Sequence, residues 1–466
     1  MNEKTLSFPK MSLLGLQHLF AMFGATILVP LLTGLDVQVT LIAMGVGTLL
    51  FHLCSKGKVP GFLGSSFAIL AGIRLITDPV GGIFAIEGWN VLTYGMAADA
   101  VAALRNEHIR SVLPYATGAI LCTAGVYLVV ALLVKVIGVK KFMTFLPPVV
   151  TAPTVILIGT MLAPFAISQS SENILLAAIT LAIIIIASTW GKGMAKITSI
   201  LLGICGAYII ALILNAAGMT NANGSDIIVF TNLSDAGIVG VPEFMLPRFH
   251  WLAIVIMIPF AIATVAEHVG DMVALSNITG NDFVEEPGLH RTLLGDGLAS
   301  AFSGLIGGPG NTTYGENVGV VALTKVFNPR VIQIGAVYAI ALGFSPIVAA
   351  VIRSIPDSII GGASFMLYGM IAAVGIRNLV ESRVDVSKTK NMTIIAVMLI
   401  MGIGMRFVSP AIMFNFGDTA VPIDRLGLAI AVVLGVVLNA VLPSEKDELS
   451  EVSMPLAPPV VEEEEK

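Results

Sequence analysis

The chain alternates between long apolar runs and short polar connections over almost its whole length. Runs of roughly 17 to 25 apolar residues are long enough to cross a hydrocarbon core about 30 Å thick as α-helices. Two runs, 59–75 and 311–325, are short, weakly hydrophobic and rich in Gly, Ser and Thr. The pattern predicts fourteen membrane segments, at 12–34, 38–54, 59–75, 112–136, 143–167, 174–190, 197–218, 249–275, 292–310, 311–325, 330–352, 355–375, 391–408 and 424–443.

The positive charges of the connections test this count, because Lys and Arg collect in cytoplasmic loops. With the amino terminus inside, 18 of the 25 Lys and Arg residues, among them every lysine, fall on the cytoplasmic side. We therefore expect a multi-pass protein of the cell membrane with both termini in the cytoplasm. Two longer stretches, 77–110 and 219–248, should lie outside. Within the first, we expect Met96 to Arg105 to form a connecting helix rather than to lie along the membrane surface.

Composition agrees with a membrane protein. Hydrophobic residues make up 56% of the chain and charged residues only 12%, against about 25% charged residues in soluble domains. The net charge of −5 owes much to an acidic tail at 444–466, so it does not indicate a nucleic-acid partner. Cys54, Cys122 and Cys205 lie in or beside apolar runs without metal-ligand spacing. Neither a disulfide framework nor a metal site is predicted, and no cofactor is implied.

The two halves of the chain carry similar residues in the same order. Gln17-His18 in the first segment matches Glu267-His268 in the eighth, and Gly64 to Phe67 in the third matches Thr312 to Gly315 in the tenth. Seven segments per half is an odd number, so the second half must run in the opposite orientation. The sequence therefore predicts an all-α polytopic protein built as a 7+7 inverted repeat. If the third and tenth segments contain half-helices, their amino ends offer N–H donors to a ligand.

Three acidic side chains lie well inside the predicted segments. Glu267 and Asp271 lie four residues apart on one face of the eighth segment, and Glu316 lies in the tenth. An acidic residue at the centre of a spanning helix costs about 2.5 to 3.5 kcal/mol on insertion scales, so a functional role is the default hypothesis. A ligand that binds one protonation state couples its binding to proton uptake, which makes these residues candidate proton-coupling groups. The alternative is a carboxylate that only fixes packing.

Asp296 and two histidines are weaker candidates. Asp296 lies about one turn into the ninth segment, near its cytoplasmic end, where we expect water to reach it. His18 follows Gln17, the counterpart of Glu267 in the repeat, and this favours a role for His18 in proton coupling. His268 should point about 100° away from Glu267, so we interpret it as a hydrogen-bonded core residue.

Aromatic residues occupy matching places in the two irregular segments. Phe67 follows Gly64-Ser65-Ser66 in the third, and Tyr314 precedes Gly315 in the tenth. A planar heterocycle gains from stacking on such a ring, so both are candidate substrate-binding residues, with a core packing role as the alternative. Tyr368 in the twelfth segment is expected to be a packing residue or a gate contact.

The residues after Tyr314 form a motif. Glu316-Asn317-Val318-Gly319, four further residues, Thr324 and Lys325 match in full the signature of the nucleobase–ascorbate transporter family, also called the second nucleobase-cation symporter family. The chain resembles this family, and the bacterial uracil permeases within it, in five further blocks: Leu16 to Thr26, Leu63 to Ala68, Ala266 to Gly270, Asp282 to His290 and Asn311 to Asn317.

The resemblance implies proton-coupled uracil symport by alternating access, with short strands in the third and tenth segments flanking the substrate. Glu267 and Glu316 would hydrogen-bond the pyrimidine. Phe67 would contact its ring, the backbone at Gly315 would contribute, and His18 would support the proton-linked network. Uracil carries N–H donors beside carbonyl acceptors, which suits carboxylates and backbone N–H groups.

The same resemblance implies two domains and a possible homodimer. A cytoplasmic N-terminus at 1–11 would come first. A core domain, surrounded by membrane lipid, would consist of segments 1–4 and 8–11, at 12–138 and 249–352. Segments 5–7 and 12–14, at 142–218 and 355–443, would form a gate domain. Two features depart from the family pattern. Asp271 stands where a histidine is expected one turn after Glu267, and the stretch 77–110 is longer than expected.

Other functions remain as alternatives. A purine permease for xanthine or urate shares the signature, although Tyr314-Gly315 before Glu316 favours uracil. An anion transporter of similar architecture would meet repulsion from the carboxylates. An integral-membrane enzyme is disfavoured because no HExxH, GxSxG or phosphate-binding Gly loop accompanies the acidic residues. A channel is disfavoured by broken segments in repeated halves.

Overall fold

The computed structural model describes residues 7–80, 82–86, 89–96, 98–139, 141–142, 147–221, 224–230, 236–407, 413–416, 419–422 and 426–443. The acidic tail at 444–466 and the start of the fifth predicted segment, 143–146, lie outside the described residues. The elements are α1 (Phe8–Thr33), α2 (Val37–Cys54), β1 (Leu63–Ser65), α3 (Phe67–Thr77), α4 (Trp89–Leu92), α5 (Ala98–Ile137), α7 (Pro148–Ser170), α8 (Ile174–Trp190), α9 (Met194–Ile197), α10 (Ser199–Ala216), α11 (Trp251–Thr279), η2 (Val284–Gly288), α12 (Leu289–Ile306), β2 (Asn311–Thr313), α13 (Gly315–Thr324), α14 (Pro329–Gly343), α15 (Pro346–Arg353), α16 (Asp357–Glu381), α17 (Thr389–Gly404), η3 (Met405–Phe407), β3 (Met413–Phe416), β4 (Thr419–Pro422) and α18 (Gly427–Val441).

Every one of the fourteen predicted segments coincides with a described helix, a bent pair of helices, or a strand followed by a helix. By length and composition, seven of the described helices can cross a membrane, and an eighth span results if the bent pair α14–α15 is counted as one. Shorter apolar helices, among them α3, α8, α17 and α18, account for further segments. The third and tenth segments are β1–α3 and β2–α13, so the prediction of an irregular structure at these two places is confirmed.

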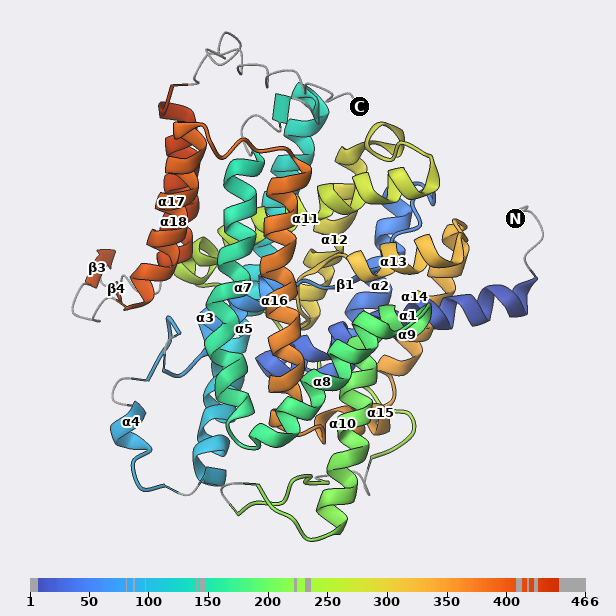
Figure 1. Ribbon diagram of the computed structural model, residues 1–466, viewed down its shortest axis with the longest axis vertical. Helices are drawn as coiled ribbons and strands as arrows, with labels where there is room; N and C mark the ends of the chain where they lie inside the picture. The colour runs from blue at the N-terminus through green and yellow to red at the C-terminus, as the bar shows by residue number, and fades with distance from the viewer. Residues whose placement is uncertain are drawn as a thin grey trace, which may run out of the picture.

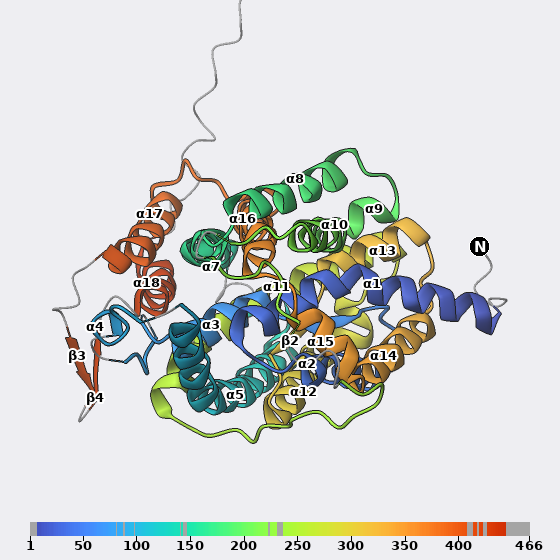
Figure 2. The ribbon, with the colours of Figure 1, turned by 90° about the horizontal axis from the view of Figure 1, so that it is seen from below.

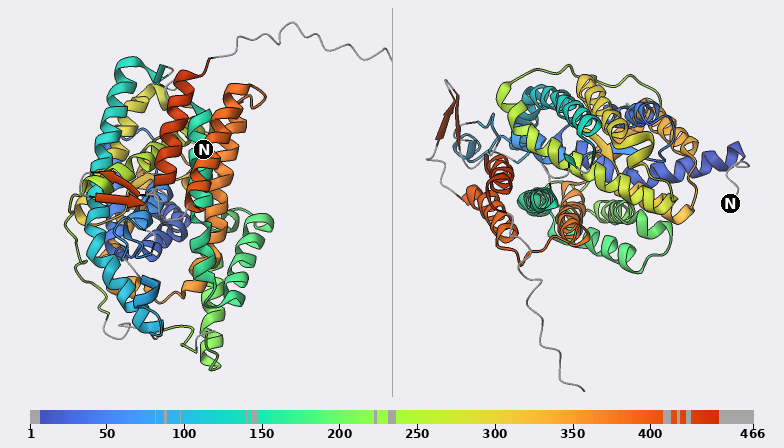
Figure 3. Two further views of the ribbon diagram at one scale, coloured as in Figure 1. Left: turned by 90° about the vertical axis from the view of Figure 1, so that its left-hand side faces the viewer. Right: turned by 90° about the horizontal axis from the view of Figure 1, so that it is seen from above.

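The helices form two groups that lie side by side (Figures 1 and 2). In the first helix group, α5 packs on α11 and α12, α2 packs on α12 and α14, and α1 packs on α14. In the second helix group, α7 packs on α16 and α17, α8 packs on α10 and α16, and α17 packs on α18. The end-on view in Figure 3 shows α7, α16, α17 and α18 on one side of the molecule. The groups touch where α3 meets α7 and where α1 meets α10.

The two short strands pair with each other inside the first helix group. They are antiparallel, with Leu63 opposite Thr313 and Ser65 opposite Asn311. Each strand continues into a half-helix, so the chain crosses the membrane here partly as strand. Such backbone persists at membrane depth only where protein groups satisfy its N–H and C=O groups. Pairing between β1 and β2 supplies part of that satisfaction.

Hydroxyl groups from neighbouring helices supply more of it. Thr48 Oγ1 of α2 accepts a hydrogen bond from the backbone N–H of Leu63 at 3.0 Å. Ser300 Oγ of α12 accepts from the N–H of Asn311 at 3.0 Å and donates to its carbonyl at 2.8 Å. Leu63 and Asn311 are the first residues of their strands, and α2 and α12 are the second and ninth predicted segments. Matching places in the two halves therefore carry the same kind of support.

The eleventh predicted segment, 330–352, is not one straight helix. Its two parts, α14 and α15, are bent by 82° at a break between Gly343 and Pro346. Pro346 lacks the backbone N–H that would continue the helix, and it disfavours helical backbone at the preceding Ser345. The prediction of a continuous span is therefore wrong at this point.

The piece from Met96 to Arg105 is not a separate connecting helix. From Ala98 onward it forms the beginning of α5, which runs for 40 residues to Ile137. At 1.5 Å per residue such a helix is about 60 Å long, roughly twice the hydrocarbon thickness. The polar first turns of α5 therefore extend a membrane segment beyond the bilayer, and the sequence-based expectation is corrected.

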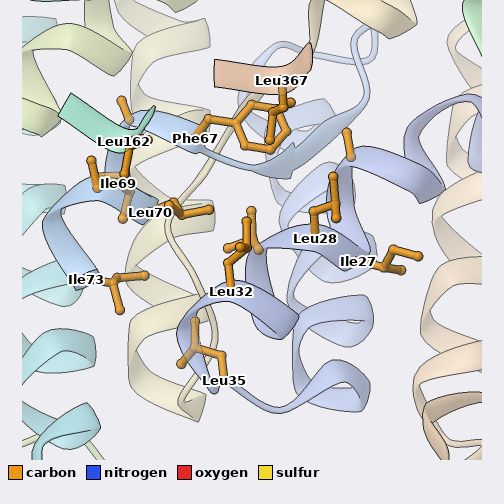
Figure 4. Packing of buried hydrophobic residues seen from close by; sticks show 14 of the residues in the cluster. Ile27, Leu28, Leu32, Leu35, Phe67, Ile69, Leu70, Ile73, Leu162 and Leu367 are labelled. Carbon is orange, nitrogen blue, oxygen red and sulfur yellow. The ribbon is translucent and has the colours of Figure 1, made fainter. Parts of the chain in front are cut away.

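Apolar packing joins the two helix groups beside the start of α3 (Figure 4). Phe67 belongs to one buried cluster with Leu162 of α7 and Leu367 of α16. The same cluster contains Leu28 and Leu32 of α1. The amino end of α3 is thus held at the junction between the groups.

We predict that Ser300→Ala lowers the free energy of unfolding by about 1 to 3 kcal/mol, because it leaves the buried N–H of Asn311 without its acceptor. Thr48→Val should have a similar effect at Leu63. Thermal unfolding of the detergent-solubilised protein measures both. Ser171→Ala, at an exposed helix end, is the control and should change stability by no more than about 0.5 kcal/mol. Equal unfolding temperatures for all three variants would contradict the assigned role of the hydroxyls.

Candidate functional site

The strand pair brings the amino ends of two half-helices into the middle of the protein. β1 leads through Ser66 into α3, and β2 leads through Tyr314 into α13. The first turn of a helix has unpaired N–H groups and a partial positive charge. In α3, Ser66 Oγ accepts one of these N–H groups, that of Ile69, at 3.4 Å. Tyr314, the residue that precedes α13, makes no side-chain cap, so the first turn of α13 lacks the support that Ser66 gives to α3.

Three carboxyl groups surround this turn of α13. Glu267 and Asp271 come from α11, and Glu316 belongs to α13 itself. All three are partly accessible, and Glu267 lies within electrostatic range of the other two. A Cβ atom placed on the exposed Gly315 would lie 3.9 Å from Asp271 Oδ1 and would meet no other described atom within 4 Å. Asp271 therefore lies beside the open space at Gly315, and Glu267 and Glu316 lie within electrostatic range of Asp271.

Asp271 has an unsatisfied oxygen beside that space. Its Oδ2 atom is buried and has no hydrogen-bond partner within the part of the chain that the structure describes. A buried acceptor without a partner costs about 1 to 3 kcal/mol, and such groups concentrate where a ligand or a proton completes the site. Asp271 thus brings one unpaired hydrogen-bond acceptor to the candidate site.

Phe67 and Tyr314 stack on each other. Their ring centroids are 5.7 Å apart and their planes differ by 17°. The Tyr314 hydroxyl donates to the carbonyl of Ser65 at 2.5 Å, and its side chain is 2% exposed. Gly64 lies against the ring, because a Cβ atom there would come within 2.7 Å of it. In this arrangement Tyr314 is the ring that supports Phe67, and its hydroxyl is already used.

His18 contacts the signature motif directly. His18 Nδ1 lies 2.6 Å from Asn317 Oδ1, and both side chains are buried. Asn317 Nδ2 also donates to the carbonyl of Pro60 at 3.2 Å. Asn317 therefore ties α1 and the approach to β1 to the first turn of α13, and the predicted link of His18 to the site runs through it.

The remaining signature residues determine how α13 ends and packs. Thr324 Oγ1 donates to the carbonyl of Val320 at 2.9 Å. Lys325 adopts a left-handed conformation with φ of 50° and closes the helix. Gly319 faces Ile197 of α9, which would be 3.9 Å from a Cβ atom. These three residues shape the half-helix and do not reach the open space through any contact described.

His268 and Asp296 form a fully buried pair behind the site. His268 Nδ1 lies 3.0 Å from Asp296 Oδ2 and 3.3 Å from Thr313 Oγ1. Thr312 Oγ1 donates to Asp296 Oδ2 at 3.0 Å. The interpretation of His268 as a bonded core residue agrees with this geometry. The expectation that water reaches Asp296 is wrong, because its side chain is 0% exposed beneath β2.

Sequence reasoning missed the residues that hold the strands. Thr48 and Ser300 lie within the apolar runs of the second and ninth predicted segments, and Asn311 opens the tenth; their roles depend on which segments lie beside them. Asn311 Nδ2, for example, donates to the carbonyl of Ala43 at 3.0 Å. The only available signal was the unusual share of small polar residues in the short segments. Among the described residues, no group of three or more His, Cys, Asp or Glu could hold a metal ion.

Known proteins are similar to this chain over nearly its whole length. The profile of the Permease family matches residues 9–411. The chain is 37% identical over 449 residues to the probable uracil permease of Haemophilus influenzae, covering 94% of this chain and 96% of that protein. It is also 37% identical over 458 residues to the uracil permease of Bacillus subtilis, covering 94% of each chain.

A solved structure has the same architecture. The transmembrane domain of a cyanobacterial bicarbonate transporter, BicA, superimposes with a TM-score of 0.59 at 15% identity, covering 93% of this chain and 98% of that one. At this identity the similarity concerns the fold alone. It confirms the predicted 7+7 inverted repeat.

We predict that His268→Leu lowers the free energy of unfolding by about 3 kcal/mol, because it leaves Asp296 buried without its main partner. Asp296→Leu should destabilise to a similar degree. The double variant should lose less than the sum of the two, since neither member of the pair is then left buried without the other. Thermal unfolding of all four proteins at one pH measures this coupling. Strictly additive losses would show that the two side chains do not act as a pair.

Proposed function

Because this chain belongs to the permease family, we propose that it is a uracil permease that carries uracil across the cell membrane together with protons. The observation that carries the proposal is the meeting of Gly315, Glu316, Glu267 and Asp271 at the first turn of α13, where Tyr314 makes no side-chain cap. The names of the similar proteins from Haemophilus influenzae and Bacillus subtilis support uracil as the substrate.

The site chemistry suits a pyrimidine dione. Uracil has two carbonyl acceptors and N–H donors on the same ring edge. Backbone N–H groups at the start of α13 donate to a carbonyl, and Glu267 and Glu316 accept from ring N–H groups. Phe67, held in place by Tyr314, offers a flat apolar surface to the ring. Substrate binding is therefore assigned to Phe67, Glu267, Gly315 and Glu316, with Tyr314 as the supporting ring.

Proton coupling follows from the crowding of the carboxyl groups. Glu267, Asp271 and Glu316 share a low-dielectric space, where like charges repel strongly. A proton that enters the cluster lowers this repulsion and also changes which groups donate and accept hydrogen bonds. Uracil that binds one protonation state then draws the proton across with it. His18 takes part through its contact with Asn317.

The two helix groups provide the moving parts of the proposal. We assign 12–138 and 249–352 to a core domain that carries the site, and 142–218 and 355–443 to a gate domain. Alternating access then corresponds to movement of one group against the other. The distribution of Lys and Arg supports cytoplasmic termini. With that orientation, α3 runs from the site toward the outer side.

We predict that an inward proton gradient drives uptake of labelled uracil into proteoliposomes containing the purified protein. Glu316→Gln should reduce this uptake at least tenfold, because it removes a proton site and replaces a carboxylate acceptor with a weaker amide oxygen. Glu285→Gln, an exposed residue of the same type, is the matched control and should transport normally. Excess xanthine should not compete.

The outcomes separate site, substrate and class. If xanthine is accumulated and uracil is not, the substrate assignment fails while the site survives. If Glu316→Gln transports normally, the assigned site is wrong. If correctly inserted protein accumulates neither nucleobase, the permease proposal itself fails.

We predict that Asp271→Asn separates binding from coupling. Asn cannot carry a proton, yet it keeps a carbonyl oxygen near Gly315. Exchange of internal for external uracil should continue within about threefold of the parent rate, while gradient-driven accumulation falls at least tenfold. Asp271→His, which restores the residue expected in uracil permeases, should recover accumulation with a different pH dependence. Equal loss of exchange and accumulation in Asp271→Asn would instead assign Asp271 to substrate binding.

A further inference from the structure

A narrow cleft runs between the two helix groups on the outer side of the site. One wall is α3, and the other is a stripe on α7 spaced as one helix face; Phe260 of α11 and Leu428 of α18 also line it. The α7 stripe consists of Ile158, Met161, Leu162 and Phe165. The cleft volume is about 40 Å³, which holds about three water molecules and is too small for a pyrimidine ring. It has the form of a passage that is nearly closed.

The same face of α3 forms both the site and the cleft wall. Phe67, Ala71, Arg74 and Asp78 are separated by four, three and four residues, so they lie along one face. Ala71, Arg74 and Asp78 line the cleft. Seven residues of helix separate Arg74 from Phe67, a rise of about 10 Å. Arg74 is therefore about two turns outward from the ring that contacts the site.

Arg74 bridges the two helix groups. Its guanidinium carbon lies 4.3 Å from the centroid of the Phe165 ring on α7. Its Nε atom is buried without an acceptor within the described part of the chain. A cation held over an aromatic face in a site shielded from water is attracted more strongly than at a surface. The contact joins α3 directly to a helix of the other group.

Charges of opposite sign continue this contact across the boundary. Asp357, at the start of α16, interacts electrostatically with Arg74 and with Arg105 of α5. Glu172, between α7 and α8, also interacts with Arg105. Across the boundary, the two arginines of the first helix group interact with two carboxylates of the second, while Asp78 interacts with Arg74 from within the first group. This complementarity stabilises the conformation in which the two helix groups contact each other at their outer end.

We propose that Arg74 is the outer gate residue of this transporter. Its contact with Phe165 closes the passage between the central site and the outer side, and the contact breaks whenever uracil enters. The proposal rests on alternating access between the two helix groups. It assigns to Arg74 no contact with substrate in the closed site. Loss of the contact opens the cleft and changes the rate of the conformational cycle.

Chemical labelling of the cleft tests this without any substrate. A single cysteine is introduced as Ala71→Cys after Cys54, Cys122 and Cys205 are replaced by serine. In intact cells, a membrane-impermeant maleimide reaches the chain from the outside only. Arg74→Gln should raise the labelling rate about fivefold, the factor expected for the loss of one cation–π contact. Phe165→Leu should raise it to a similar degree, and Arg74→Lys should raise it less.

Arg353→Gln is the matched control. Arg353 is exposed and pairs with Asp36, and both belong to the first helix group, so its loss should leave labelling unchanged. Unchanged labelling in Arg74→Gln or in Phe165→Leu overturns the proposal. An equal increase in Arg353→Gln also overturns it, because the effect would then be a general loosening. If either Arg74→Gln or Phe165→Leu fails to reach the membrane, the labelling rate of the other variant still tests the proposal.

Uptake measurements distinguish this gate from the proposed substrate. Arg74→Gln should change the maximal rate of uracil uptake at least threefold, while the uracil affinity of the detergent-solubilised protein changes less than twofold. A loss of affinity with an unchanged rate would place Arg74 in the binding site and overturn its role as a gate. Faster labelling in a protein that does not transport uracil would keep the gate and reject only the substrate.

Discussion

Broken backbone at membrane depth is the constraint on which this structure depends. Lipid offers no hydrogen bonds to the backbone groups that β1 and β2 expose, so the protein must supply every partner. The strands pair with each other, and hydroxyls from α2 and α12 bond to Leu63 and Asn311. Tyr314 makes no equivalent side-chain cap at the start of α13. The candidate site lies at this helix start, beside the Asp271 oxygen that has no hydrogen-bond partner among the described residues.

The same constraint divides the molecule into a part that stays together and a part that can slide. The strands, their hydroxyl partners and the buried pair His268–Asp296 interlock α2, α11 and α12. In the proposed transport cycle, the site moves with them as a unit. Across the group boundary the described contacts are mainly apolar, with Arg74 over Phe165 as a polar exception. Apolar surfaces slide at lower cost than hydrogen-bonded networks break. A gate at Arg74 fits this division of roles.

The order and type of the segments were predictable because they rest on local signals. Apolar run length gave the fourteen segments, and Gly, Ser and Thr content marked the two broken ones. Contacts between distant segments were not predictable in this way. Nothing near Ser300 in the sequence indicates that it bonds to Asn311, and the burial of Asp296 depends on β2 lying over it. The bend before Pro346 had a local signal, but apolar run length outweighed it in the prediction.

Asp271 shows how one substitution changes the electrostatics of a shared site. A histidine at this position would be neutral or positive and would relieve the repulsion between Glu267 and Glu316. An aspartate is neutral or negative, so it can only add to that repulsion unless it is protonated. Gly315 and the first turn of α13 lie close enough to Asp271 for the helix dipole to offset part of this charge. A carboxyl cluster without a nearby cation is therefore easiest to occupy after protons have entered. Under the proposed proton coupling, this favours an order in which proton binding precedes uracil binding and uracil then stabilises the protonated cluster.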